Sequence, residues 1–461
     1  MLEKQIISEV LAIAMSTGGD FAELYVEDRF NLGINMVKGV VENTLSGRDY
    51  GVGLRIIHGL NAVYTYMSGF DVATLKTLAR KAAATISGVP KSAALDLVET
   101  PFVNHHEVKI VPQSVATARK VQLMREGSDA AFAASNEISQ VVVNYLDYRQ
   151  NILIANTEGL FKTDERVRTR YSISTVATRG GLMQEGRDSF GRGMGFEMFD
   201  EIDVRAIGAE AARTSLVMLD AKAAPSGRFP AVLDNAFGGV IFHEACGHGL
   251  EASAVAKGHS VYTGKLGQQI ASPLVNAVDD GTIPNGWGSL NIDDEGNPTS
   301  RNLLIENGVL KGYMVDRLNG MRMNMAPTGS TRRQSYKFAP TSRMTNTYIL
   351  NGNMPKAELF AGVEKGLYAA KLGGGSVNPA TGEFNFAVLE GYMIENGTVT
   401  HPVKGATLIG TGLEVLQKID AVSDNFASGE GMCGASSGSI PAGLGQPALR
   451  VSEITVGGQE S

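Results

Sequence analysis

Disulfide bonds and membrane spans are the first features that this sequence lacks. Its 461 residues include only two cysteines, Cys246 and Cys433, which is too few for a disulfide framework. No uncharged apolar stretch approaches the roughly 20 residues that cross a bilayer. The apolar positions near the N-terminus are interrupted by Glu3 and Glu9, unlike those of a secretory signal. We therefore expect a cytoplasmic protein with no membrane partner.

A surplus of basic residues is also missing. Lysine and arginine number 41 against 48 aspartate and glutamate, and the net charge of −7 argues against a nucleic-acid partner. Proline is sparse, with 15 residues, and glycine is abundant, with 55, which indicates tight turns between strands rather than a disordered chain. The length favours several domains, and hydrophobic residues at 43% give them apolar surface to bury.

The pattern of apolar residues predicts an α+β fold with an N-terminal α+β region over residues 1–220. This region consists of two similar helix-plus-sheet units, at about 1–110 and 111–220. Apolar residues at helical spacing predict helices, and alternation with a period of two predicts the strands of an α/β sheet. The helices are expected at 2–15, 71–86, 114–135 and 200–219, the strands at 31–67 and 166–178, and a hairpin at 138–155.

A linker at Ala221–Gly227 precedes the C-terminal domain, residues 221–461, which we expect to be mostly β. Phe229–Leu233 is typical of a strand, and a helix carrying the chemical motif should follow it. Asn307-Gly308 and Asn396-Gly397 lie between apolar runs, the strongest short signal for a hairpin turn. Further helices are expected at 356–368 and 413–419.

The motif is His243-Glu244-Ala245-Cys246-Gly247-His248. Catalytic zinc sites use three protein ligands, and a common pair is two histidines four residues apart on one helix, with a glutamate base between them. Here the histidines are five apart, which places them about 140° apart around a regular helix. A π-bulge would restore the four-residue geometry, and Gly247 and Gly249 would ease the bend.

Two alternatives stand beside this interpretation. The segment could be an apolar helix that holds two incidental histidines. A metal could also be held by His243 and Cys246, which are three residues apart and share a helix face without any bulge, leaving His248 unused. Cys246 is more simply interpreted as a small packing residue.

A third metal ligand must come from elsewhere in the chain. Cys433 is the best candidate, because glycines on both sides let its backbone approach closely and thiolate binds zinc well. A buried free cysteine is the alternative interpretation. His259 is a weaker candidate. Glu251 could be a ligand or an outer partner that orients the imidazole of His248.

Together these residues resemble the TldD subunit of the TldD/TldE (PmbA) zinc metalloprotease family. Phe242–Glu251 resembles that subunit's signature, and the resemblance is specific over residues 229–455. Other segments that fit the family are Leu304–Tyr313, Arg332–Tyr336, Arg343–Tyr348, Pro402–Gly410 and Gly431–Gly434. The chain departs from the family pattern at Ala252-Ser253, Cys246, Ala435 and Gly438.

The resemblance implies one zinc ion per chain, held by His243, His248 and Cys433, with Glu244 as the general base. It also implies hydrolysis of short or unfolded peptides. The chain would be the catalytic subunit of a heterodimer with a TldE/PmbA-like subunit that lacks the metal motif, or would form a homodimer.

Substrate contacts are less sharply indicated. Arg332, Arg333 and Tyr336 could bind a peptide carboxylate or the peptide backbone, could stabilise the oxyanion, or could belong to an ordinary exposed strand. Two rival functions share the motif, namely a zinc amidase acting on a small molecule and a non-proteolytic modulator with a structural zinc.

Overall fold

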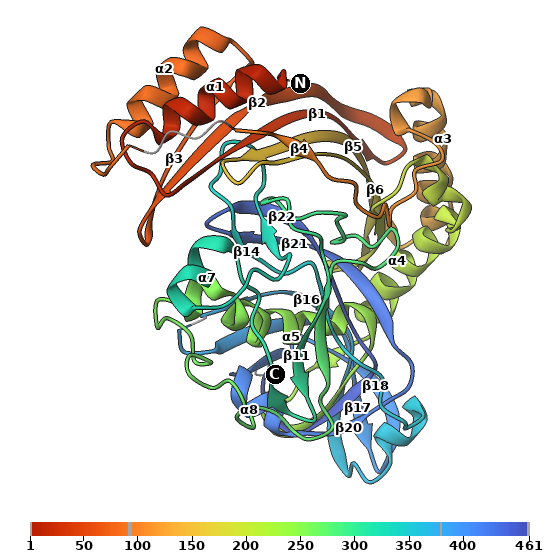
Figure 1. Cartoon of the computed structure of the whole chain (residues 1–461). Coiled ribbons are helices and arrows are strands. Elements are labelled where there is room, and N and C mark those ends of the chain that lie inside the picture. Colours follow the sequence, from red (N-terminus) through yellow and green to blue (C-terminus); the bar gives the residue numbers. More distant parts are fainter. Residues whose placement is uncertain (1, 91–94, 379, 459–461) are drawn as a thin grey trace.

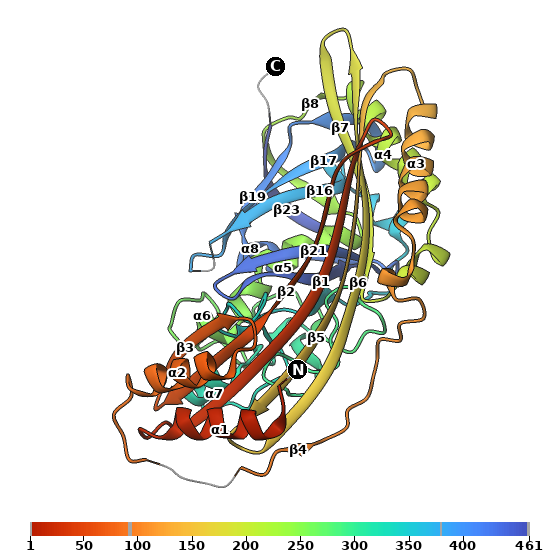
Figure 2. The same ribbon diagram turned by 90° about the horizontal axis from the view of Figure 1, so that it is seen from above.

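The computed structural model describes residues 2–90, 95–378 and 380–458, and within them the N-terminal region is built on one seven-stranded sheet. The strand order is β3-β2-β1-β5-β6-β4, and β7 also pairs with β6. Its strands are β1 (Phe21–Val37), β2 (Val40–His58), β3 (Asn61–Ser68), β4 (Val98–Glu99), β5 (Ile138–Asn156), β6 (Leu160–Arg179) and β7 (Leu182–Arg192). The 20 residues of β6 extend about 66 Å at 3.3 Å per residue, and Figure 2 shows these strands running the length of the molecule.

Two helix pairs cover opposite ends of this sheet (Figure 2). Apolar side chains of the helices and strands make a separate core at each end. Asp71 begins the second helix, because its side chain accepts a hydrogen bond from the Thr74 amide. The α+β prediction is confirmed, and the two helix-plus-sheet units share one sheet. The helices are α1 (Lys4–Met15), α2 (Val72–Ala83), α3 (Thr117–Ala133) and α4 (Val204–Leu219).

The hairpin predicted at 138–155 is wrong, because this segment is the single strand β5. It pairs with β1 on one side and β6 on the other along nearly its whole length. This two-sided pairing satisfies the backbone without a turn.

The C-terminal domain is mostly β, as predicted, and packs two larger sheets around the motif segment. The eight-stranded sheet contains β8 (Lys222–Ala223), β9 (Gly227–Leu233), β16 (Lys365–Val377), β17 (Glu383–Glu395), β18 (Thr398–Lys404), β19 (Thr407–Thr411), β20 (Ile419–Val422) and β23 (Leu449–Gly457). The six-stranded sheet contains β10 (Ala277–Asp280), β11 (Arg301–Glu306), β12 (Val309–Leu310), β15 (Asn346–Ile349), β21 (Ala427–Ala435) and β22 (Gly438–Gln446). A small pair is β13 (Thr331–Arg332) with β14 (Thr341–Ser342), and short helices are α6 (Ala252–Val255), α7 (Arg317–Met323) and α8 (Gly412–Gln417).

In this domain, the two predicted hairpin turns are confirmed, whereas one predicted helix is wrong. Asn307-Gly308 and Asn396-Gly397 have positive φ and join β11 to β12 and β17 to β18, which confirms both hairpins. The helix predicted at 356–368 is wrong. Only a 3₁₀ turn forms, over Lys356–Phe360, and β16 begins at Lys365 because its pairing with β9 and β17 outweighs helical propensity.

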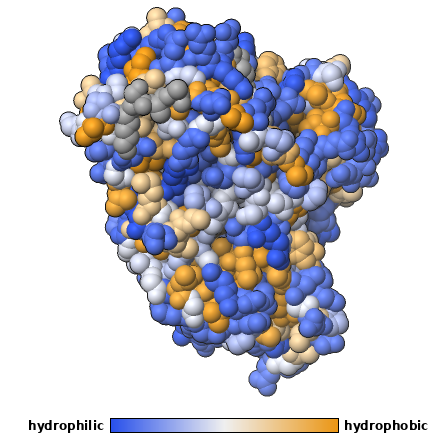
Figure 3. All heavy atoms as spheres, in the orientation of Figure 1, coloured by the Kyte–Doolittle hydropathy of each residue, from blue (hydrophilic) through white to orange (hydrophobic). Residues whose placement is uncertain are grey.

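The N-terminal sheet arches over the C-terminal domain (Figure 1). Ion pairs cross the contact between them. Arg55 of the sheet pairs with Glu23 at 2.9 Å and with Glu295 of the C-terminal domain at 2.5 Å. Arg166 pairs with Asp294 at 2.7 Å. Hydrophilic residues dominate the face in Figure 3, with patches of hydrophobic residues over the lower part. In the described part of the chain, no helix has the length and apolar character needed to cross a membrane.

Candidate metal centre

The motif segment lies between the two C-terminal sheets and is broken in the middle. The chain leaves β9, makes the 3₁₀ turn η3 (Ala236–Gly239), and continues as α5 (Val240–Ala245) and then the 3₁₀ turn η4 (Gly247–Leu250). Phe242 is buried in the core to which both sheets contribute. The strand and the helical motif segment were both expected, but the segment is not one continuous helix.

The break at Cys246 replaces the predicted π-bulge, so that part of the prediction is wrong. Cys246 has φ −126° and ψ −51°, away from helical geometry, and a 3₁₀ turn follows it. A side chain at residue 247 would be crowded, because a Cβ there would lie 2.2 Å from the Met344 sulfur. The break redirects the chain between His243 and His248, which is the task that the bulge was expected to perform.

Three donor atoms converge on the buried side of this break. The Cys433 Sγ lies 3.3 Å from His243 Nε2 and 3.2 Å from His248 Nε2. The ligand atoms of these residues all lie within 4.8 Å of one another. The two imidazole rings are nearly perpendicular, at 88°. Cys433 belongs to β21, an edge strand of the six-stranded sheet, so the site joins residues some 190 positions apart.

The electrostatics of the three groups suit a cation. Burial alone would raise the pKa of the Cys433 thiol, but His243 and His248 lower it to about 3 through their charge and hydrogen bonds. Burial opposes protonation of His248, yet Glu251 and Cys433 raise its pKa well above the ordinary value. A thiolate therefore faces an imidazolium, and a metal ion would displace that proton on binding. Two imidazoles and one thiolate form a donor set that fits zinc.

An outer layer of charge supports these groups. Glu251 lies 3.3 Å from His248 Nδ1, on the side opposite the convergent Nε2 atoms, so it can orient the ring but is not among the three donors. Arg343 lies 3.6 Å from Glu251 and donates from Nη2 to the Cys433 carbonyl at 2.6 Å. Sequence reasoning gave Arg343 no role, and the only signal was its place in the Arg343–Tyr348 segment.

Glu244 occupies the open side of the cluster. Its Oε2 lies 3.6 Å from His248 Nε2, and its side chain keeps 23% of its exposure while His248 keeps 11%. His243 and Cys433 are more deeply buried. A carboxylate that lies beside the donor atoms and keeps part of its exposure can meet a reactant that arrives from solvent.

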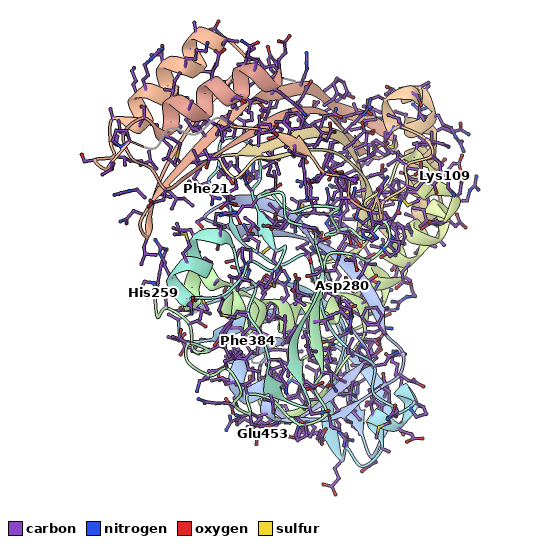
Figure 4. All side chains as sticks on the ribbon, viewed as in Figure 1. Phe21, Lys109, His259, Asp280, Phe384 and Glu453 are labelled. Carbon is purple, nitrogen blue, oxygen red and sulfur yellow. The ribbon has the colours of Figure 1, made fainter. Side chains whose placement is uncertain are left out.

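The rival ligands lie elsewhere. Cys246 is fully buried, and burial raises its pKa to about 12 despite a hydrogen bond with Tyr262, so its thiol remains neutral and packs in the core. This agrees with its interpretation as a packing residue. His259 is exposed at the edge of the domain (Figure 4) and is absent from the convergent group.

Arg332, Arg333 and Tyr336 are buried, so the alternative of an exposed strand is wrong. Arg332 donates to the Met344 carbonyl at 2.8 Å, Arg333 pairs with Glu23 at 2.8 Å, and the Tyr336 amide donates to Glu27 at 2.7 Å. Arg333 and Tyr336 therefore help join the C-terminal domain to the N-terminal sheet. None of the three belongs to the group of convergent donors.

Sequence profiles of one family match most of the chain. The PmbA/TldA metallopeptidase C-terminal domain matches residues 226–458, the central domain matches 110–219, and domain 1 matches 22–86. Metalloprotease TldD homolog of Haemophilus influenzae is 37% identical over 99% of this chain and 97% of its own length. Zinc metalloprotease TldD homolog of Saccharolobus solfataricus is 32% identical over 62% of this chain and 64% of its own length.

Solved structures share the fold at low identity. A putative modulator of a DNA gyrase from Thermotoga maritima has a TM-score of 0.81 and 20% identity, covering 98% of this chain and 100% of that one. TldE from Thermococcus kodakarensis has a TM-score of 0.78 and 17% identity, covering 98% and 99%. The profiles and the near full-length relative, together with the convergent cysteine and histidines, lead to one conclusion: the chain belongs to the TldD family of PmbA/TldA metallopeptidases.

Proposed function

We propose that this chain is a zinc-dependent peptidase that hydrolyses short or unfolded peptides. The observation that carries the proposal is the convergence of Cys433 Sγ with the Nε2 atoms of His243 and His248, with the Glu244 carboxylate beside them on the exposed side. Three donors from the described residues, rather than four, are the number typical of catalytic zinc. One relative that carries the name zinc metalloprotease supports this choice of metal.

Each residue has a distinct task in the proposed reaction. Zinc bound by such a set would supply a Lewis acid that polarises the peptide carbonyl and acidifies water. Glu244 takes a proton from the attacking water on its carboxylate and passes it to the nitrogen of the leaving amine as the C–N bond breaks. Glu251 holds the ring of His248 from Nδ1. Arg343 fixes both Glu251 and the Cys433 backbone.

We further infer that the chain is the catalytic subunit of a complex with a TldE-like subunit. The likeness of its fold to TldE and the family resemblance support this inference. Both cysteines are free in the structure, which suits the reducing cytoplasm as the site of action.

Substitution of Glu244 tests the proposal. Glu244 is not one of the proposed ligands, and Glu244→Gln keeps the size of the side chain, so zinc content should stay at about one per chain. Because the amide cannot accept the proton of the attacking water, hydrolysis of an unstructured peptide should fall about 10²–10⁴-fold. Zinc content by atomic absorption and peptide cleavage by chromatography, with and without a TldE-like subunit, give the answer. Full peptidase activity in the zinc-loaded variant would contradict the mechanism and favour a structural zinc. Cleavage of small amides but not of peptides would favour the amidase.

A further inference from the structure

A buried arginine near the metal centre has no counter-ion. Arg332 is only 3% exposed, and its one hydrogen bond within the described residues runs from Nη1 to the Met344 carbonyl. No described carboxylate lies within ion-pair distance of it, whereas its neighbour Arg333 pairs with Glu23 and Arg166 pairs with Asp294. A buried charge without a partner is strongly unfavourable, so a partner from outside the chain is expected.

Arg332 lines a cavity of about 180 Å³ in which positive charge dominates. Four other arginines line it, and Asp294 is the one acid among its lining residues. That acid is already engaged, because it accepts from Arg166 at 2.7 Å and from the Arg333 amide at 2.6 Å. The volume is several times the roughly 30 Å³ that one water molecule occupies in the liquid. A carboxylate or phosphate group fits in such a space.

The nearby groups leave the charge on Arg332 unbalanced. Burial lowers its pKa to about 9, and Arg168 acts in the same direction while Asp294 opposes it, so the guanidinium stays protonated near neutral pH. Asp279 is another buried acid, and the charge of Arg332 lowers its pKa, but its oxygens already accept hydrogen bonds from Thr345 and Thr347. Arg168 donates to backbone carbonyls of Trp287 and Ser289 rather than to a carboxylate.

The cavity also adjoins the elements that hold the metal ligands. Met432 and Ile440 line it, and they flank and pair with Cys433 on the hairpin of β21 and β22. Met344, whose carbonyl accepts from Arg332, follows Arg343, which holds the Cys433 carbonyl. A ligand in this cavity would therefore lie on the same framework as the proposed zinc site.

We propose that this cavity binds an oxyanion through Arg332 and that the oxyanion is a carboxylate of the peptide substrate. The planar guanidinium provides the forked pair of donors that a carboxylate accepts. The assignment to a substrate carboxylate rests on the proposed peptidase function, and the oxyanion site itself does not.

Thermal unfolding with inorganic phosphate tests the oxyanion site without any need for activity. Phosphate should raise the Tm of the parent protein by about 3 °C more than sodium chloride at equal ionic strength. Arg332→Met should lose this rise, and Arg332→Lys, which keeps the charge without the fork, should show a smaller one. Arg149→Gln, which removes an arginine paired with Glu165 and 42% exposed, should keep it. No rise in the parent, or an equal rise in the Arg332 variants, overturns the site.

Matched peptides identify the source of the oxyanion. A peptide with a free C-terminal carboxylate should have a KM about 10-fold lower than its C-terminal amide, as expected for a hydrogen bond between charged groups. Phosphate should compete with the acid and narrow the difference. The difference should disappear in Arg332→Met, shrink in Arg332→Lys and persist in Arg149→Gln. If phosphate stabilises the protein but both peptides have the same KM, the site binds a free anion and the assignment to substrate is wrong.

Discussion

The contact between the N-terminal sheet and the C-terminal domain, and the metal centre, both bury ionisable side chains, but they balance charge in opposite ways. At the contact, Arg55 lies between Glu23 and Glu295, so both signs come from the chain itself. At the metal centre, Cys433 meets two imidazoles whose donor atoms point at one another. The first cluster is complete, whereas the second, under the proposed function, would be completed by a metal cation. Buried charge alone therefore does not mark a functional site.

The largest expected effect is a difference between substitutions of the two cysteines in the C-terminal domain. Cys433→Ala removes a donor from the convergent group, so zinc content and peptidase activity should both fall to background. His243→Ala and His248→Ala should lose zinc and activity in the same way as Cys433→Ala. Cys246→Ala removes a neutral thiol that packs in the core, and it should keep zinc and activity.

Zinc content by atomic absorption, measured beside circular dichroism to confirm folding, distinguishes these outcomes. Zinc that remains in folded Cys433→Ala, or zinc that is lost from folded Cys246→Ala, would overturn the ligand assignment and favour the pair His243 and Cys246.

The sequence could name the three residues whose donor atoms converge because their residue types are rare in the chain. Two of seven histidines flank a glutamate in one segment, and the only other cysteine lies between glycines. It could not give the shape of the break at Cys246, where Met344, almost 100 residues away in the chain, leaves no free space for a Cβ at Gly247. Propensity and spacing describe a segment by itself, so a tertiary contact of this kind is beyond them.

The same limit explains why the role of Arg333 and Tyr336 was not foreseen. Their partners, Glu23 and Glu27, lie on β1, some 310 residues away. In the sequence these acids only interrupt an apolar strand with a period of two, a pattern that also describes a sheet facing water. Only the packing of the C-terminal domain on that face makes them buried partners.

The second prediction tests whether the buried charges at the contact between the N-terminal sheet and the C-terminal domain depend on one another for stability. Arg55→Met leaves Glu23 and Glu295, each about 1% exposed, with one partner fewer, so the free energy of unfolding should fall by about 3–5 kcal/mol. Arg48→Met breaks the pair with Asp28, in which Arg48 is 56% exposed, and should cost at most about 1 kcal/mol. Urea unfolding followed by circular dichroism measures both. If the two variants lose equal free energy of unfolding, the ion pairs at the contact contribute no more than surface pairs do.

The smallest effect concerns a carboxyl group at the same contact, and it depends on pH. Burial raises the pKa of Glu27 from 4.5 to about 7, although the Tyr336 amide and Gln150 favour its charged form. Because the folded state holds this proton more tightly than the unfolded state, the contribution of Glu27 to stability is full below about pH 4.5 and is lost as pH rises through 7. The loss is at most roughly 3 kcal/mol.

Glu27→Gln has no proton to lose, so its free energy of unfolding should change less between pH 5 and pH 8 than that of the parent. Glu165→Gln, at an exposed pair with Arg149, serves as the control and should follow the parent. Urea unfolding of the three proteins at both pH values measures the difference, and a Glu27→Gln protein as sensitive to pH as its parent would show that Glu27 is already ionised at the contact.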